Sequence, residues 1–372
     1  MLEPDLINKA KRYSTLKYTL AILDTIYFLA ILIIFVCSGL SKLLAGTFSA
    51  SVANKYFVLA LYLFTVSLAY YFLSLPLNFY RSYIVEHRFS LSKQKLGDWI
   101  LDQVKSGIIG YIISLILLGA FYYILRLEPY NWWLIISAFW IFFNFILARL
   151  APVIIIPLFF KYKKLTDDIL RERIMNLAEK MRVKILDVFE IDLSKKTLKA
   201  NAAFVGWGST KRVILADTLK DKYSLDEIEV ILAHEFAHYK LKHLLKLILV
   251  NSLATIVFFY LIFKSSRPAL SLFGFSSLSD LAGLPVILIY FVLFNIVAQP
   301  LEAYISRRLE RNADMLAIKI SGMKDAFISA MDKLAAQNLA DRKPHPVIKF
   351  FFFDHPPIDE RIAMAKEQGR FS

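Results

Sequence analysis

Long apolar segments alternate with charged segments along this chain of 372 residues. A helix that crosses a bilayer needs about 20 mostly apolar residues, and six segments meet this requirement. They lie at about residues 18–39, 57–79, 107–126, 131–157, 244–264 and 284–305. The fourth is long and is expected to break near Pro152 or Pro157, because proline disrupts a helix interior. The pattern therefore predicts a mainly α-helical, polytopic membrane protein.

The composition supports this prediction. Hydrophobic residues make up 57% of the chain, and the mean hydropathy is +0.52. A soluble domain averages about 45–50% apolar residues. The net charge is +14, but no basic helix or recognition motif for nucleic acid is present, so we expect membrane lipid and not nucleic acid as a partner. Cys37 is the single cysteine, which excludes a disulfide within the chain.

Positive charges indicate the orientation of the spans. Lys and Arg gather in the N-terminal tail, in the loop after the second span and in the KYKK segment after the fourth, whereas the alternate loops carry few. Cytoplasmic loops are enriched in Lys and Arg. An even number of crossings places both termini on one side, and the charges predict that this side is cytoplasmic. The polar start of the chain does not resemble a cleavable signal peptide.

Four polar residues lie within or near the spans: Asp24, Asn144, Arg149 and Asn251. Polar groups at membrane depth usually face the bundle interior or a wet cavity. The alternative is that some of them lie at span ends and reach the interface. The sequence leaves both possibilities open.

Residues 161–243 are predicted to form a small cytoplasmic α+β unit. An amphipathic helix over 166–181 has Thr166 or Asp167 as its cap, and a strand is expected over 183–191. Residues 198–219 have the pattern of a β-hairpin that turns at 208–210.

A second helix of this unit begins at Ser224. Glu227 follows three residues later, which is the spacing of a capping box. This helix is expected to run through the sequence HEFAH and to continue into the fifth span.

The chain is thus expected to have four parts. An N-terminal membrane domain covers 1–160 and contains four spans and a cytoplasmic loop at 80–106. A cytoplasmic region with the hairpin and the helix through HEFAH covers 161–243, two further spans cover 244–305, and a helical C-terminal region covers 306–372.

The HEFAH sequence carries candidate metal chemistry. On a helix, positions i and i+4 share a face, so His234 and His238 can point nitrogen atoms at one metal ion. Glu235 lies beside the first histidine, where it can act as a general base toward the attacking water. The alternative is a hydrogen-bonded pair of core histidines. His243 stays unassigned, as it can be only an interfacial residue one turn past the site.

A catalytic zinc site needs three protein ligands and an open position. Glu310 and Asp314 are candidates in the sequence RRLERNAD, because they lie four residues apart on one helical face. Glu310 can bind the ion while Asp314 orients a histidine through its second nitrogen. The alternative is a charged surface helix.

Five segments together resemble the type I CAAX prenyl protease family, which are integral-membrane zinc endopeptidases of the gluzincin group. These segments are YIVEHRFSLSKQKLGDW, NAAFVGWGSTKRVILADTL, HEFAHYKLKH, RRLERNAD and NLADRKPHPVIKFFFFDHPPIDERI. They occur in the order that the family has and extend over most of the chain.

The resemblance implies roles for the candidate metal residues. His234, His238 and Glu310 would bind one zinc ion per chain. Glu235 would activate water, and Asp314 would support a ligand.

The resemblance also implies roles for residues outside these helices. His355 and Arg361, in HPPIDER, would stabilise the oxyanion or the substrate backbone. Asn201 and Ala202 would lie in a strand that pairs with an extended substrate. Without the resemblance, these residues would be interpreted as part of a Pro-rich turn, a solvated helix and an ordinary hairpin.

The family's helices surround an intramembrane chamber, and its eukaryotic members have seven spans. Six are counted here, and the seventh would be at the N-terminus, so six to seven spans are expected. The chain looks prokaryotic, which implies a place in the inner membrane with the catalytic side facing the cytoplasm. The expected substrate is a peptide or protein, with or without a lipid, that is cleaved near its C-terminus.

Two alternatives remain. An HtpX-type quality-control protease, which degrades damaged membrane proteins, shares HExxH and a downstream Glu but usually lacks the long EHRFSLSKQ loop and the HPP tail. A non-catalytic membrane scaffold is the other alternative, but every expected ligand and the base are present.

Overall fold

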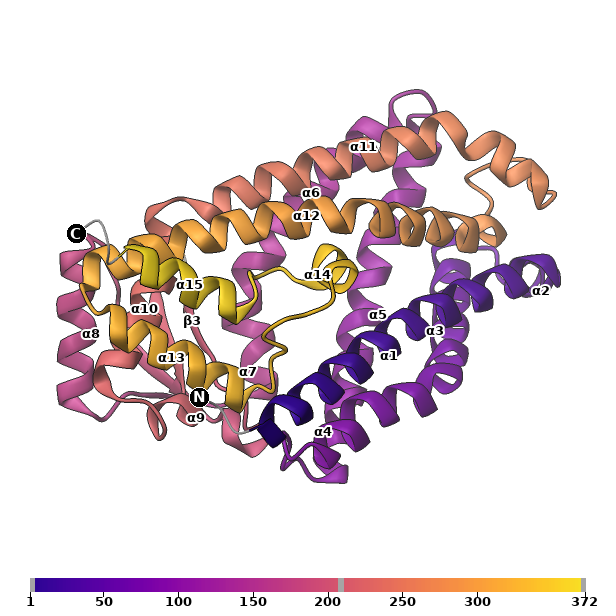
Figure 1. The fold of residues 1–372 in the computed structure, drawn as a ribbon. Coiled ribbons are helices and arrows are strands. Elements are labelled where there is room, and N and C mark those ends of the chain that lie inside the picture. The colour runs from indigo at the N-terminus through magenta and orange to yellow at the C-terminus, as the bar shows by residue number, and fades with distance from the viewer. Residues whose placement is uncertain (1–3, 207–210, 369–372) are drawn as a thin grey trace.

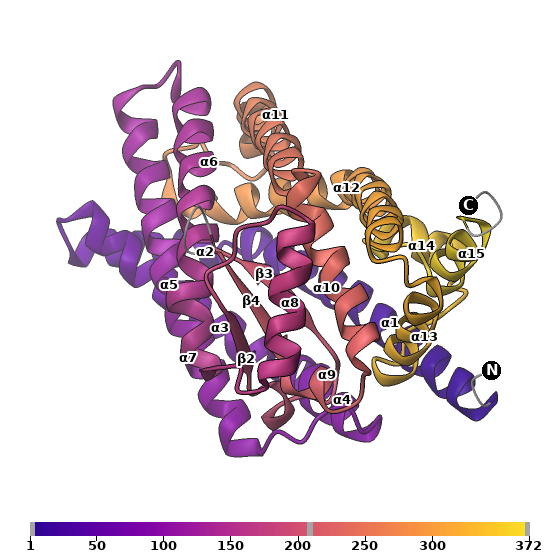
Figure 2. The same ribbon diagram turned by 90° about the vertical axis from the view of Figure 1, so that its left-hand side faces the viewer.

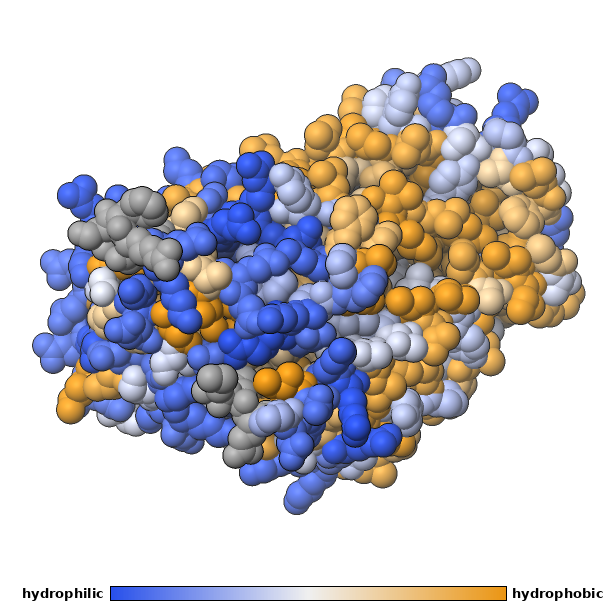
Figure 3. Space-filling view, viewed as in Figure 1, coloured by the Kyte–Doolittle hydropathy of each residue, from blue (hydrophilic) through white to orange (hydrophobic). Residues whose placement is uncertain are grey.

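The computed structural model describes residues 4–206 and 211–368, which form an elongated molecule with an apolar end and a polar end (Figures 1 and 3). Apolar side chains gather at the end where α2 lies. Polar side chains gather over α8, α13 and α15 at the opposite end. This division matches the predicted alternation of membrane spans and polar segments.

Six helices in the described part of the chain are long and apolar enough to cross a membrane. They include α1 Pro4–Cys37, α3 Lys55–Phe79, α5 Leu96–Leu127, α6 Trp132–Leu150, α11 His243–Leu272 and α12 Leu284–Ser321. The predicted number of spans, counted over these residues, is confirmed. Most of these helices extend well beyond the apolar segments that predicted them.

Two of the spans change helical geometry near one end. After α6, a π-helical turn at Ala151–Ile155, which contains Pro152, leads directly into α7 (Ile156–Phe159), so the helix changes geometry there instead of breaking. A similar turn at Tyr80–Ile84 joins α3 to α4 (Val85–Arg88). Such turns accommodate an extra residue in the helical hydrogen-bond ladder.

Three of the four polar residues near the spans have identifiable surroundings. Arg81 donates a hydrogen bond to Asp24 at 2.8 Å, which pairs the two charges between α1 and the end of α3. Asn144 and Asn251 line a cavity of about 570 Å³ between α6, α11 and α12. A cavity location, one of the two possibilities that the sequence left open, therefore holds for Asn144 and Asn251.

The polar end contains a four-stranded sheet with the order β1-β2-β4-β3. The strands are β1 Tyr162–Lys164, β2 Val188–Ile191, β3 Ala202–Val205 and β4 Arg212–Ala216. β3 and β4 pair antiparallel, as the predicted hairpin requires, and the expected turn at 208–210 lies outside the described residues. The strand expected over 183–191 forms only at its C-terminal half, and β1 was not expected from the sequence.

Apolar side chains of β4 alternate between two clusters, as they must in a strand. Val213 and Leu215 belong to the main core, which also contains apolar residues of α8 (Asp168–Lys180) and α10 (Leu225–Lys240). Ile214 and Ala216 point to the opposite face, where residues around α7 cover them. Figure 2 shows α8 and α10 side by side against the sheet.

The predicted helix starts in this region are confirmed. Asp167, not Thr166, caps α8 by accepting a hydrogen bond from the N–H of Leu170 at 3.0 Å. Ser224 and Glu227 form both hydrogen bonds of a capping box at the start of α10.

The remaining helices are short or lie in the C-terminal region. They are α2 Leu40–Ser51, α9 Asp217–Lys220, α13 Lys324–Gln337, α14 Pro346–Phe352 and α15 Ile358–Gln368, with 3-10 turns at Leu193–Lys195 and Leu281–Gly283.

The connection between the polar end and the spans differs from the expectation in two places. α10 does not continue into the fifth span but ends at Lys240, and α11 begins at His243. Conversely, the sixth span and the following polar helix form one continuous helix, α12, of 38 residues. A helix of this length extends about 57 Å, so it carries its polar end well beyond the membrane.

Candidate functional site

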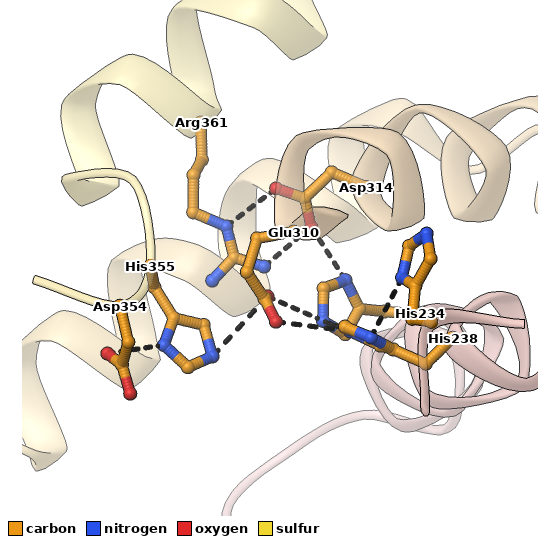
Figure 4. Close-up of polar contacts among 8 residues, drawn as sticks. His234, His238, Glu310, Asp314, Asp354, His355 and Arg361 are labelled. Atoms are coloured by element: carbon orange, nitrogen blue, oxygen red, sulfur yellow. Dashed lines mark hydrogen bonds and ion pairs between the residues drawn. The ribbon is translucent and has the colours of Figure 1, made fainter. Parts of the chain in front are cut away.

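The candidate metal residues meet where α10 packs against α12 (Figure 4). The Nε2 atoms of His234 and His238 lie 3.0 Å apart. The carboxylate of Glu310 lies 3.1 Å from Nε2 of His234 and 3.2 Å from Nε2 of His238. Each residue thus offers a ligand atom within 4.8 Å of the other two.

Small residues explain how the two helices approach so closely. Ala233 and Ala237 flank the histidines on α10, and Ala313 and Ala317 lie near Glu310 on α12. All four alanines are fully buried in the same core cluster. Because alanine side chains are short, the helix axes can come together and the longer ligand side chains can reach one another.

Asp314 connects the site to the C-terminal region. Its carboxylate is fully buried and lies 2.8 Å from Nδ1 of His234, the nitrogen that faces away from the other ligand atoms. Arg361 of α15 donates two hydrogen bonds to the same carboxylate, at 2.7 and 2.6 Å. This bidentate pair holds Asp314 in the orientation that contacts His234.

His355 approaches the site from the segment between α14 and α15. Its Nε2 lies 3.3 Å from Glu310, and its Nδ1 pairs with Asp354 at 2.8 Å. Burial opposes a charge on His355, but Asp354 and Glu310 outweigh this effect and raise the pKa of the imidazole. About half of the His355 side chain is exposed, so it faces both the ligands and the open cleft.

Glu235 contrasts with these residues because its carboxylate forms no hydrogen bond or ion pair with any residue that the structure describes. Burial raises its pKa above the ordinary value for glutamate. Glu235 lines a cleft of about 450 Å³, which His234, His355 and Arg361 also line. A carboxylate in this position is free to accept a proton.

Asn201 and Ala202 line the same cleft. Ala202 begins β3 and Asn201 directly precedes it; within the described residues β3 pairs only with β4, which makes it an edge strand. The carbonyl of Asn201 accepts a hydrogen bond from Ala216, so this strand's inner side is occupied by β4. Its other side is the free edge of the sheet.

The donor set fits a metal ion. Ligands that surround zinc tetrahedrally at about 2.0 Å are separated by about 3.3 Å, and the three separations given above are close to this value. Oε2 of Glu310 is buried without a hydrogen bond from the described residues, which a cation would compensate. Burial disfavours a charge on His234, but the carboxylates of Asp314 and Glu310 prevail and raise its pKa to about 10, so the site favours positive charge.

Two residues at the site were not assigned from the sequence. Asp354 precedes His355 directly, and only the structure pairs their side chains. His243 contacts the ring of His238, with the two Nδ1 atoms 3.1 Å apart. The spacing HxxxHxxxxH brings His243 close to His238 along the chain. Residues five apart do not share a helix face, however, so this spacing does not predict a contact.

Two family models together match nearly the whole chain. The N-terminal model of CAAX prenyl proteases, described as five membrane helices, matches residues 1–161. The model of peptidase family M48 matches residues 164–368. Within this range, the described residues 4–161 contain four helices of spanning length and the shorter helix α2.

Individual proteins show the same similarity. An uncharacterized metalloprotease, YhfN, from Bacillus subtilis is 30% identical over 99% of this chain and 87% of its own length. CAAX prenyl protease 1 from Saccharomyces cerevisiae is 31% identical over 77% of this chain and 67% of its own. The crystal structure of S. mikatae Ste24p superimposes with a TM-score of 0.88 at 26% identity, and covers 98% of this chain and 90% of that chain.

Proposed function

The chain belongs to peptidase family M48 and is a multi-span membrane metalloprotease, and we propose that His234, His238 and Glu310 hold one catalytic zinc ion. Two imidazoles and a carboxylate form a typical ligand set for catalytic zinc, with the fourth position left for water or substrate. The observation that carries this proposal is the convergence of the three ligand atoms beside an unpaired Glu235 in one cleft. When bound, zinc supplies a Lewis acid that polarises the peptide carbonyl and acidifies water.

Glu235 is the proposed general base. Its carboxylate has no partner among the described residues, and it lines the cleft next to His234. Because burial raises its pKa, the carboxylate takes up a proton more readily than an exposed glutamate would. It would remove a proton from the attacking water and deliver it to the leaving amine.

Asp314, His355 and Arg361 are proposed to support the reaction from one side of the cleft. The carboxylate of Asp314 lies 2.8 Å from Nδ1 of His234, so it favours a proton on Nδ1 and leaves Nε2 for the ion. His355 presents Nε2 near Glu310 and, with its raised pKa, can donate to a developing oxyanion. Arg361 fixes Asp314 and also lines the cleft, where it can contact the substrate backbone.

The edge strand β3 is proposed to bind the substrate. An extended peptide can add to the free edge at Asn201 and Ala202, because an exposed strand offers unpaired backbone donors and acceptors. Both residues line the cleft that contains Glu235. Strand addition would therefore hold the scissile bond at a constant distance from the general base.

The proposed substrate is a peptide or protein that is cleaved near its C-terminus, as the names of the CAAX prenyl protease relatives suggest. The cleft is lined partly by α1, through Tyr18, and partly by the polar region, so it lies where spans and polar end meet. This position would suit a substrate that carries a lipid.

We place the active site on the cytoplasmic side of a prokaryotic inner membrane. The predicted cytoplasmic loop after α4 contacts the polar region, where Leu198 donates a backbone hydrogen bond to Leu91 at 2.9 Å. The N-terminal part of α1 lies at this end as well, since Lys199 pairs with Glu86 and Tyr13. The Lys-rich and Arg-rich segments thus share one side, as the positive-inside rule requires.

Cleavage of a CAAX-terminated peptide, with and without a farnesyl group, tests the function. The purified protein in detergent is compared with its Glu235→Gln variant. Cleavage that depends on the farnesyl group supports a prenyl-protein substrate. Equal cleavage of both peptides would show that the lipid is not recognised and would indicate a broad membrane peptidase. No cleavage of either peptide would reject the CAAX assignment.

A further inference from the structure

His243 is buried at the first position of α11, and the metal chemistry described above does not use it. Its ring meets the ring of His238 nearly at a right angle, with the centroids 5.0 Å apart. The Nδ1 atoms of the two rings lie 3.1 Å apart, which is hydrogen-bond distance. The contact is therefore polar and specific, and not only apolar packing.

The break between α10 and α11 creates this contact. On an uninterrupted helix, residues five apart point about 140° away from each other, because each residue advances about 100°. Here α10 ends at Lys240, and Lys242 adopts the left-handed conformation with φ +55°. A lysine rarely adopts this conformation, and it is found where surrounding structure or function demands it. The turn brings His243 back onto the ring of His238.

The position of the ligand atoms decides which ring donates. His238 can bind a metal through Nε2 only if Nε2 carries no proton, so its proton must lie on Nδ1. Nδ1 of His243 must then accept this proton in a hydrogen bond. His243 is consequently neutral, with its own proton on Nε2, and that atom is buried without a partner among the described residues.

We infer that His243 is a positioning residue that fixes the tautomer and ring orientation of His238 for metal binding. This inference rests on the proposed ligand role of His238. The two histidine ligands then have different supports. Asp314 contacts Nδ1 of His234 as a carboxylate, whereas His243 contacts Nδ1 of His238 as a neutral imidazole. No carboxylate of the described residues lies against that nitrogen.

Zinc affinity of two matched variants tests the inference. Asparagine can place an acceptor oxygen near the position of Nδ1, whereas leucine fills the space without an acceptor. The zinc dissociation constant of each full-length variant is measured in detergent by competition with a chelator. We expect His243→Leu to weaken zinc binding about 10–100-fold, which is the usual effect of losing such a support, and His243→Asn to stay within a few-fold of the parent protein.

A second readout separates positioning from packing. The absorption spectrum of the cobalt-substituted protein reports the ligand geometry directly. His243→Leu should shift the cobalt bands, whereas His243→Asn should leave them near those of the parent protein. The matched control is His345→Leu, which removes an exposed histidine outside the cleft and should change neither quantity.

The outcomes distinguish this inference from the proposed ligand set. If His238→Ala keeps full zinc, the ligand assignment itself fails. If His238→Ala loses zinc while His243→Leu binds zinc as the parent protein does, only the role of His243 is rejected. If the leucine variant does not fold, ¹⁵N-histidine NMR of the zinc-loaded parent protein tests the inference instead. The His243→Asn variant identifies the resonances of His243. A proton on Nδ1 of His243 would overturn the inference.

Discussion

Two glutamates lie about two turns apart on helix α10, and their surroundings are opposite. Glu227 belongs to the start of the helix, and Glu235 lies between the two candidate metal ligands near its end. Both are largely withdrawn from water. One is surrounded by donors and the other has none among the described residues.

Glu227 is a structural residue. Its carboxylate accepts hydrogen bonds from the N–H of Ser224 at 2.7 Å, from Ser329 at 2.6 Å and from Lys333 at 2.7 Å. Burial alone would raise the pKa of Glu227, but these donors outweigh burial and lower it. The carboxylate thus stays ionised and ties the start of α10 to α13.

Glu235 keeps its carboxylate unpaired in the described structure, and burial raises its pKa. A buried polar group without a partner costs about 1–3 kcal/mol of stability, which a purely structural residue would avoid. On one helix, the same residue type thus stabilises the fold where donors surround it, whereas beside the candidate ligands none of the described residues donates to it. Four sets of substitutions test this division, starting with the largest expected effect.

Removing a ligand should abolish the metal site. His238→Ala and Glu310→Ala each leave two ligands, so both should lose stoichiometric zinc and all measurable peptide cleavage. The capped end of α10 is untouched in both variants, so each should elute from size-exclusion chromatography as the parent protein does. Metal analysis that finds one zinc per chain in either variant would point to a different ligand set.

Removing the general base should affect turnover alone. Glu235→Gln keeps the size of the side chain but cannot accept a proton, so kcat should fall about 10²–10⁴-fold. Zinc content should remain that of the parent protein. Normal cleavage by this variant would sink the assignment of Glu235 as the base.

Removing the charge at the structural end should affect stability alone. Glu227→Gln weakens the bonds to Ser329 and Lys333 and should lower the free energy of unfolding by about 1.5–3 kcal/mol at neutral pH. Because the pKa of Glu227 is lowered in the folded protein, its contribution is present above the ordinary glutamate pKa of about 4.5 and is lost as the pH falls below that value.

Denaturant titrations of this variant and of the parent protein should therefore converge as the pH is lowered below about 4.5. A gap that stays constant across this range would mean that the ionised form of Glu227 has no special role. Zinc content serves as the control, since it should not change.

The smallest effect is expected at the helix cap. Ser224→Ala removes the acceptor for the N–H of Glu227 and should lower the free energy of unfolding by about 1 kcal/mol, with cleavage unchanged. Ser224→Asp supplies another good cap and should restore stability. A change in kcat in the alanine variant would show that the two ends of α10 are coupled.

Much of this architecture is predictable because local patterns encode it. The length of the apolar segments predicted the six spans, and the spacing of Ser224 and Glu227 predicted a capping box that the structure contains. The i, i+4 spacing likewise placed His234 and His238 on one face. The short strand β1 was not predicted, because three residues are too few to show the alternation of apolar and polar side chains that indicates a strand.

The sequence by itself determined the spans, the helix starts and the residue types of the candidate site, since each depends on neighbours along the chain. Only the tertiary structure decided how they meet. Glu310 reaches the histidines because buried alanines let α10 and α12 approach, and Arg361 reaches Asp314 across 47 residues of chain. His243 contacts His238 only because the helix breaks at Lys242. Such contacts depend on packing and on backbone turns, which the periodicity of a sequence does not encode.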